Sequence, residues 1–376
     1  MARTHTKPDR GANEDVALVL QGGGALGAYQ AGAYEGLIKQ ARHVSWVAGI
    51  SIGAINAAII AGNAPHQRLE RLRTFWEQVS SKSLPATIFD GIWARTFLNQ
   101  FSASTTTLVG VPGFFDLRIP PAALMPPGTV GASSYYDTAP LRTTLERLVD
   151  FDLLNSGDIR LSLGAVNVET GNLTWFDTAN QRIGPEHIMA SGALPPGFPA
   201  VEIEGAYYWD GGLVSNTPLQ YIMDEQKSQS DLCVFQVDLF NARGVLPASV
   251  WQSEAREKEI RCSSRTRFNT DMMRRLHDTS AAARRLYDKL PAAMKSDPDA
   301  LALLKGAADP HITIAHLIYR PTKYEGGSMD YEFSRSSMLD HWHAGKADAE
   351  HTVNHPDWKN RQRSTECVQV FDLSNH

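Results

Sequence analysis

The sequence has few cysteines, no long uninterrupted apolar run and no excess of positive charge. Its 376 residues include three cysteines, and without a Cys-x-x-Cys pair they favour a reducing compartment over a disulfide framework. No window of 18 apolar residues is free of glycine or polar breakers, so no membrane-spanning helix is expected. The formal net charge of −5 does not favour nucleic acid or another polyanion as a partner.

The N-terminus also lacks the apolar stretch that a secretory signal needs. Residues 1–14 are polar and charged, and we predict that they are disordered. A cytoplasmic protein is therefore expected, and peripheral contact with a membrane stays an open alternative.

Continuous apolar runs predict the strands of a buried parallel sheet. Residues 15–21, 45–50 and 231–240 are such runs, and strands that read this way lie in sheets covered on both faces. Helical patterns separate them, which is typical of a three-layer α/β/α domain with a mostly parallel central sheet. We place this domain at residues 15–243.

Two segments differ from the predicted domain in composition. Residues 81–134 carry little charge and are rich in aromatic side chains, proline and glycine. Residues 244–376 form a C-terminal extension, predicted to be mainly helical with a strand near 311–320 that rejoins the sheet.

Three consecutive glycines follow the first predicted strand, in "VLQGGGALGAYQAG". Gly22, Gly24 and Gly27 fit the G-x-G-x-x-G spacing of a dinucleotide-binding loop. Such a domain needs an acidic residue near the end of its second strand to hold a ribose hydroxyl. Here that strand ends in "VAGIS", which argues against a dinucleotide.

The second strand leads into "GISIG", residues 49–53, which matches G-x-S-x-G. This pattern places a serine on a strained strand-to-helix turn, where larger flanking side chains would clash. The N-terminus of the following helix favours a developing negative charge beside that serine. Ser51 is therefore the candidate nucleophile.

A base for this serine is less obvious, because no histidine stands in a clear loop after an acidic residue. The better partner is Asp210 in "WDGG", at the end of a predicted hairpin strand. Two following glycines let the backbone approach closely, and a desolvated carboxylate beside a serine can act as a general base. The other interpretation of this motif is an ordinary turn.

Taken in their order along the chain, the glycine loop, the serine motif and the aspartate motif resemble those of the patatin-like phospholipase family. The resemblance rests on "GGGALG" (22–27), "GISIG" (49–53) and "DGG" (210–212), and on "ASGALPPGFPAV" and "SNTPL", which resemble segments beside the aspartate. It covers about residues 15–240. The later part of the chain resembles an uncharacterised region that follows patatin domains in some bacterial proteins.

The resemblance implies a serine hydrolase that cleaves carboxylic esters of lipids, of the phospholipase A, lysophospholipase or lipid esterase type. Ser51 would be the nucleophile and Asp210 the base of a two-residue dyad, with no metal and no organic cofactor. The main chain of the glycine loop would form the oxyanion hole. The implied oxyanion-hole residues are Gly22, Gly23 and Gly24, and the glycines that support the elbow and the dyad are Gly49, Gly53, Gly211 and Gly212.

One position departs from the family pattern. Many members carry Arg or Lys at the fifth loop position, where this chain has Leu26, and this weakens the expectation of a phospholipid substrate but not that of an ester. Two other functions stay open, an acyltransferase that uses the same dyad and a non-catalytic scaffold that binds lipid or protein.

The two unusual segments each allow two interpretations. Residues 81–134 are either a lid or lipid-contacting wall, or an insertion whose aromatic side chains fill the core. The Arg-rich stretch 254–289 either meets anionic lipid head groups or is a solvated helix face with interleaved acids.

Overall fold

The computed structural model describes residues 14–39, 43–80, 110–226, 230–305, 311–320, 331–362 and 368–373. Within these ranges, nine strands form one sheet in the order β11-β10-β9-β1-β2-β5-β8-β7, and β6 also pairs with β5. The strands of this sheet are β1 (Glu14–Leu20), β2 (Trp46–Gly49), β5 (Arg160–Asn167), β6 (Leu173–Asp177), β7 (Val201–Ile203), β8 (Ala206–Asp210), β9 (Asp231–Asp238), β10 (Ile312–Ile318) and β11 (Val368–Asp372). A separate two-stranded sheet pairs β3 (Asp116–Leu117) with β4 (Tyr136–Asp137).

The middle of the large sheet is parallel, and its antiparallel strands lie at one side. Strands β11, β10, β9, β1, β2 and β5 run parallel, whereas β6, β7 and β8 pair in the antiparallel direction. Leu20 pairs with both Gly49 and Val237, so β1, β2 and β9 end at the same edge. The loops that follow these three strands therefore meet there, as ligand-binding loops do in open α/β sheets.

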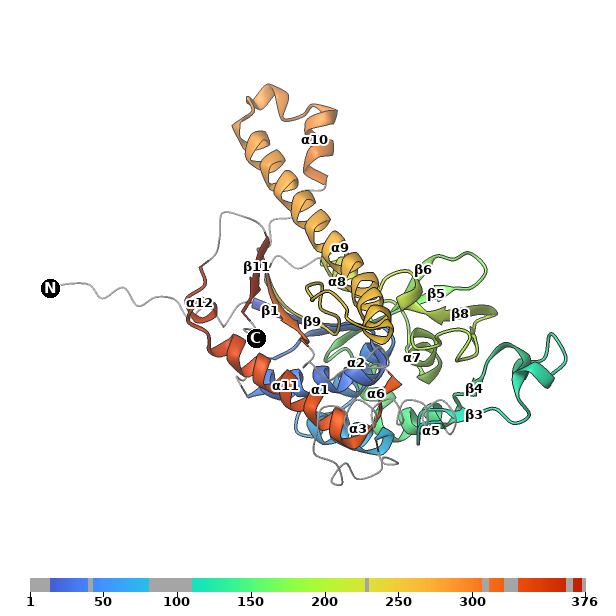
Figure 1. The fold of residues 1–376 in the computed structure, drawn as a ribbon. Coiled ribbons are helices and arrows are strands. Elements are labelled where there is room, and N and C mark those ends of the chain that lie inside the picture. The colour runs from blue at the N-terminus through green and yellow to red at the C-terminus, as the bar shows by residue number, and fades with distance from the viewer. Residues whose placement is uncertain are drawn as a thin grey trace.

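Helices cover both faces of the sheet, which confirms the three-layer α/β/α class (Figure 1). One face is covered by α1 (Ala28–Ile38), α2 (Ile52–Ala61), α3 (Arg68–Val79) and α11 (Arg335–Asn354). On the other face lies α8 (Leu219–Glu225), which contacts the long helix α9 (Val250–Lys289). The shorter helices are α5 (Ala139–Leu148), α6 (Phe151–Leu154), α7 (Pro185–Ser191), α10 (Pro298–Lys305) and α12 (Pro356–Lys359), with 3-10 segments at Gly24–Gly27, Ala122–Leu124, Val130–Ser133, Gly211–Leu213 and Ala292–Met294.

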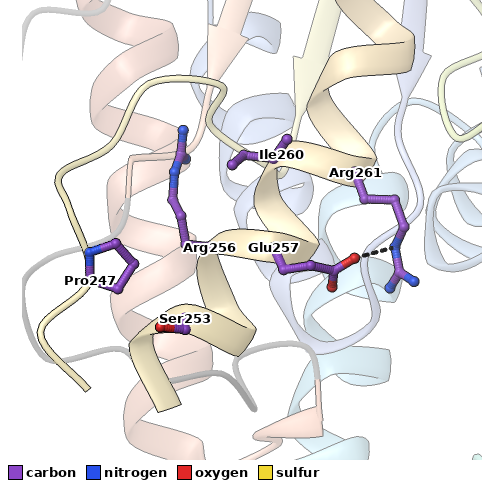
Figure 2. A pocket seen from close by; sticks show the side chains of 6 residues that line it. All are labelled: Pro247, Ser253, Arg256, Glu257, Ile260 and Arg261. Carbon is purple, nitrogen blue, oxygen red and sulfur yellow. Dashed lines mark ion pairs between the residues drawn. The ribbon is translucent and has the colours of Figure 1, made fainter. Parts of the chain in front are cut away.

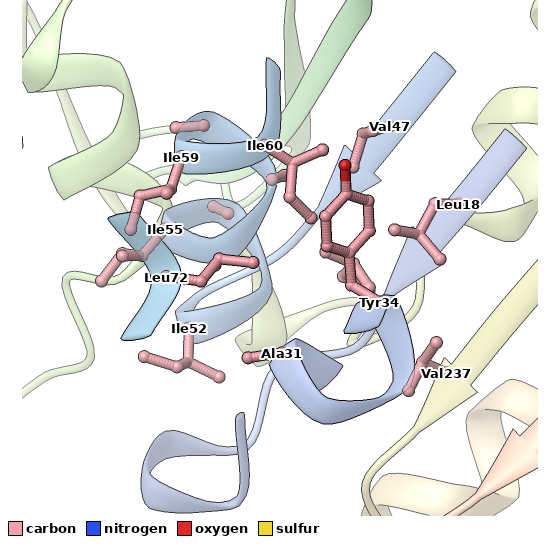
Figure 3. Packing of buried hydrophobic residues seen from close by; sticks show 14 of the residues in the cluster. Leu18, Ala31, Tyr34, Val47, Ile52, Ile55, Ile59, Ile60, Leu72 and Val237 are labelled. Atoms are coloured by element: carbon pink, nitrogen blue, oxygen red, sulfur yellow. The ribbon is translucent and has the colours of Figure 1, made fainter. Parts of the chain in front are cut away.

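Alternation along the strands divides the core into two clusters. Leu18 and Leu20 of β1 belong to the larger cluster, and Ala17 and Val19 belong to the smaller one. In the larger cluster the apolar side chains of α1 and α2 pack against strands β1, β2 and β9, with Leu72 of α3 beside them (Figure 3). Helix α2, the helix after Ser51, is buried along its whole length.

The C-terminal region is built into the same fold. Helix α11 crosses α1 so closely that a Cβ atom on Gly32 would lie 1.9 Å from the Trp342 carbonyl oxygen, and one on Gly345 would lie 2.0 Å from that of Tyr29. Polar contacts add to this crossing, because the Tyr29 hydroxyl donates to the buried Asp348 carboxylate at 2.7 Å.

The predicted elements agree with the structure in kind and differ at their ends. The helix expected from the glycines to about residue 40 begins with a 3-10 turn, and α1 ends at Ile38. The late strand, β10, pairs with β9, and β11, which we did not predict, pairs with β10. The disorder expected for residues 1–13 lies outside the described residues, and Glu14 is already part of β1.

We predict that Gly32→Ala destabilises the fold, because the added methyl group cannot fit at the α1–α11 crossing. Overpacking of this kind costs about 1–3 kcal/mol of unfolding free energy, which urea denaturation would measure. Gly192→Ala is the matched control, since its methyl group would lie 3.9–4.0 Å from its nearest neighbours. Equal stability of the two variants would show that the crossing is looser than described.

Candidate active site

Ser51 occupies a strained turn between strand β2 and helix α2. Its φ of 57° and ψ of −125° lie in the mirror image of the extended region, which glycine adopts readily and other residues adopt at a cost of about 1–3 kcal/mol. Ser51 is the N-cap residue of α2, which begins at the next residue, Ile52. The first N–H groups of α2 therefore place partial positive charge close to Ser51.

The turn depends on close approach of backbone segments that leaves no room for side chains. A Cβ atom on Gly49 would lie 2.3 Å from the Gly53 carbonyl oxygen, and one on Gly53 would lie 2.3 Å from that of Leu20. Both positions thus require glycine. These are the two elbow glycines of the G-x-S-x-G pattern, and the structure gives the steric reason for each.

Asp210 is the last residue of β8, and its side chain is 3% exposed. The carboxylate accepts a hydrogen bond from the Gly212 N–H at 2.7 Å. Burial raises the pKa of Asp210 from 3.8 to about 6, and the nearby Ser51 hydroxyl and the Gly212 N–H partly oppose this rise. The two residues, separated by 159 positions in the sequence, are therefore brought close enough to interact.

The two glycines after Asp210 also stand where side chains would collide. A Cβ atom on Gly211 would lie 2.5 Å from the carbonyl oxygen of Gly164 in β5, and one on Gly212 would lie 2.9 Å from the Asn216 side-chain oxygen and 3.1 Å from the Asp210 carboxylate. Both positions therefore favour glycine.

The glycine loop lies directly beside the serine turn. A Cβ atom on Gly22 would be 3.1 Å from the Cβ of Ser51, and the Gly22 N–H donates to the Asn216 carbonyl oxygen at 3.1 Å. Among the described residues, the N–H groups of Gly23 and Gly24 have no protein acceptor. Of the three loop glycines, Gly23 and Gly24 thus have N–H groups that no described residue accepts from, and Gly22 lies where a side chain would clash.

Two polar residues that the sequence analysis did not single out hold this arrangement. The Asn216 side chain donates to the Gly22 carbonyl oxygen at 2.8 Å, and Asn216 lies in the "SNTPL" segment. The buried Ser191 hydroxyl accepts from the Ser51 N–H at 3.1 Å and donates to the Gly164 carbonyl oxygen at 2.7 Å. Both lie in or next to segments quoted for the family resemblance, which was the available signal.

A chain of buried amides supports the glycine loop from the α2 side. The Gln30 side chain donates to the Gln21 carbonyl oxygen at 2.6 Å, and the Asn56 side chain donates to Gln30 at 2.9 Å. The indole of Trp76 donates to Asn56 at 3.0 Å. Asn56 is therefore a positioning residue for the loop. The Leu26 side chain, also in the loop, is fully buried and presents no charge to the site.

The aromatic segment 81–134 is described only from residue 110 onward. Phe114 and Phe115 pack into an aromatic cluster with Tyr136 and Phe198, so these two side chains fill the core. The lid prediction for Phe89, Trp93, Phe97 and Phe101 lies outside the described residues.

A surface hollow of about 390 Å³ lies apart from these residues, between the β9–α9 loop and the start of α9 (Figure 2). Its lining includes the Arg261–Glu257 ion pair, 3.7 Å between the charged atoms. Arg256 also lines it, but its guanidinium already donates to the Asn241 carbonyl oxygen and to Glu259. None of the lining residues belongs to the Ser51 site.

None of the described helices is both long and apolar enough to cross a membrane. Likewise, nowhere in the described ranges do three or more His, Cys, Asp or Glu side chains gather as metal ligands would.

Comparison with known proteins identifies two family matches. Residues 18–223 match the model described as patatin-like phospholipase, and residues 260–365 match one described as patatin phospholipase. No curated protein matches the sequence.

Solved structures give more distant likenesses. VipD from Legionella pneumophila is 13% identical with a TM-score of 0.39, and the match covers 90% of this chain and 66% of VipD. This chain therefore spans slightly less than two thirds of VipD. The ExoU–SpcU complex from the type III secretion system of Pseudomonas aeruginosa is 15% identical with a TM-score of 0.28, covering 90% of this chain and 75% of the other.

The strained turn makes a prediction about stability that does not depend on activity. Ser51→Gly and Ser51→Ala both remove the hydroxyl, but only glycine adopts this φ without strain. We expect the unfolding free energy of Ser51→Gly to exceed that of Ser51→Ala by about 1–2 kcal/mol. The glycine variant should therefore unfold at a higher temperature. Thermal denaturation measures the difference, and an alanine variant as stable as the glycine variant would contradict the strain.

Proposed function

Because the chain belongs to the patatin-like phospholipase family, we propose that it hydrolyses carboxylic esters of lipids through an acyl-enzyme formed on Ser51. Family membership supports the broader statement, lipid acyl hydrolysis. The observation that carries the finer proposal is the position of Ser51 on a strained turn beside the buried carboxylate of Asp210. A nucleophile needs such a base within hydrogen-bond reach.

In the first half-reaction, the Ser51 oxygen attacks the ester carbonyl carbon and its proton passes to the Asp210 carboxylate. The tetrahedral intermediate collapses with cleavage of the bond to the leaving oxygen, which takes the proton from Asp210. In the second half-reaction, water attacks the acyl-serine and gives a proton to Asp210. Release of the fatty acid returns that proton to Ser51, so each half-reaction leaves Asp210 ionised.

The negative charge of each tetrahedral intermediate would be stabilised by main-chain donors of the glycine loop. The N–H groups of Gly23 and Gly24 are the candidates, because Gly22 already donates to Asn216. A single donor of this kind contributes about 2.7–4 kcal/mol to transition-state stabilisation in known hydrolases. The N-terminus of α2 adds a dipole of the same sign.

A fluorophosphonate probe tests the nucleophile directly. We expect the probe to label wild type, and Ser51→Ala to lose both labelling and ester hydrolysis. Asp210→Asn should be folded but at least about 100-fold less active, since it removes the base. Ser156→Ala, which removes an exposed serine, is the control and should label normally.

Undiminished labelling of Ser51→Ala would refute the proposed nucleophile. Supplying a competing alcohol as acceptor separates the two enzyme hypotheses, because an acyltransferase would form the new ester in preference to the free acid.

The raised pKa of Asp210 sets the pH dependence. The base must be ionised, so kcat/KM for a water-soluble ester should fall about tenfold per pH unit below about 6 and reach a plateau above it. The pH–rate profile of wild type measures this. An inflection near 4 instead would show that burial does not raise the pKa in solution.

The raised pKa of Asp210 also makes folding stability depend on pH, but stability falls with rising pH whereas activity rises. Because the folded pKa lies above 3.8, the folded state binds the proton more tightly, and stability is lost as pH rises from about 4 to about 6. Asp210→Asn cannot titrate at this position. Its unfolding free energy should therefore gain on wild type by roughly 2 kcal/mol between pH 4 and pH 8.

A further inference from the structure

Three loops beside Ser51 are almost without charge. They are residues 192–200, 211–218 and 239–249, and together their 28 residues carry one charged side chain, Arg243. At the chain average of 20% charged residues, about six would be expected. Exposed apolar side chains in such loops favour an apolar partner over an ionic one.

Each of these loops is attached to the proposed catalytic machinery. The first follows Ser191, whose hydroxyl accepts from the Ser51 N–H, and the second follows Asp210. The third begins at Leu239, whose side chain would lie 2.7 Å from a Cβ atom on Gly23. Each of the uncharged loops therefore begins beside the serine site.

These loops expose large apolar side chains, which we name the apolar rim. Val245 is 87% exposed and Leu246 is 92% exposed, next to each other at the tip of the β9–α9 loop. The other members of the apolar rim are Leu194, Leu213 and Val214, together with Val250 at the start of α9, which are exposed as well.

Hydrogen bonds to helix α9 hold the start of the β9–α9 loop in place. Arg256 of α9 donates to the carbonyl oxygens of Asn241 and Ala242, and Glu259 holds its guanidinium at 2.8 Å. A Cβ atom on Gly244 would lie 2.8 Å from that guanidinium, so the loop rests directly on it. Val245 and Leu246 follow immediately and extend outward instead of folding back over the core.

We propose that the apolar rim docks on the surface of an electrically neutral lipid aggregate, with Val245 and Leu246 inserting among the acyl chains. This inference rests on the proposed function and names the physical form of its substrate. A lipid surface fits because it buries apolar side chains without requiring charged partners. It differs from the Arg-rich stretch 254–289, which would select anionic lipids.

The test is co-sedimentation with vesicles of pure phosphatidylcholine. We expect full-length Ser51→Ala, which cannot turn over substrate, to sediment with them. In the same background, Val245→Asp combined with Leu246→Asp should reduce the partition coefficient at least about tenfold. In the active enzyme, this pair of substitutions should leave kcat/KM for a monomeric short-chain ester unchanged and lower hydrolysis of vesicle lipid.

Leu286→Asp is the matched control, because Leu286 is a 58% exposed leucine near the C-terminal end of α9. This end of α9 projects away from the sheet (Figure 1). The Leu286→Asp substitution should not alter sedimentation. The proposal is overturned if the Val245/Leu246 double variant binds as well as its parent, if Leu286→Asp weakens binding equally, or if binding requires anionic lipid. If wild type shows no activity on the soluble ester, the proposed function is refuted instead. Vesicle binding can still be measured in that case, so the two failures are distinguishable.

Discussion

The site depends on one constraint, the close approach of backbone segments around Ser51. The ends of β1 and β2, the start of α2 and the β5 strand lie so near each other that Gly49, Gly53 and Gly211 each occupy places where a Cβ atom would be within 2.5 Å of a carbonyl oxygen. This packing forces Ser51 into its positive φ, and the strain is retained because the surrounding sheet is buried and cannot relax.

The same packing also raises the pKa of Asp210. Asp210 is removed from water by the same segments that bring it to Ser51, and the loss of hydration raises its pKa to about 6. A carboxylate with an ordinary pKa would be a weak base toward serine, whereas one that could not ionise at neutral pH would be no base at all. The hydrogen bond from the Gly212 N–H and the nearby Ser51 hydroxyl both favour the charged form.

Sequence patterns predicted the local parts of this arrangement. Apolar runs bounded by turn residues identified the strands, and the spacing of the glycines singled out Ser51 and Asp210. These signals are local, because each motif reflects a backbone conformation that involves only a few neighbouring residues. Asn216, Ser191 and the Trp76–Asn56 contact were not predicted, since their partners lie 20 to 194 positions away. No periodicity encodes such pairings. Phe114 and Phe115 show the same limit, because composition alone did not distinguish a lid from a core.

The C-terminal region illustrates how distant sequence supports the site. Helix α1, which begins after the glycine loop, carries Gln30 toward that loop on one side and Gly32 toward α11 on the other. Trp342 and Lys346 of α11 donate to Glu35 of α1 at 2.7 and 2.6 Å. The position of α1 is thus fixed from both sides, and through Gln30 this fixes the Gln21 carbonyl, one residue before the first loop glycine. A region that looks like an appendage in the sequence is part of the scaffold that holds the proposed oxyanion donors in place.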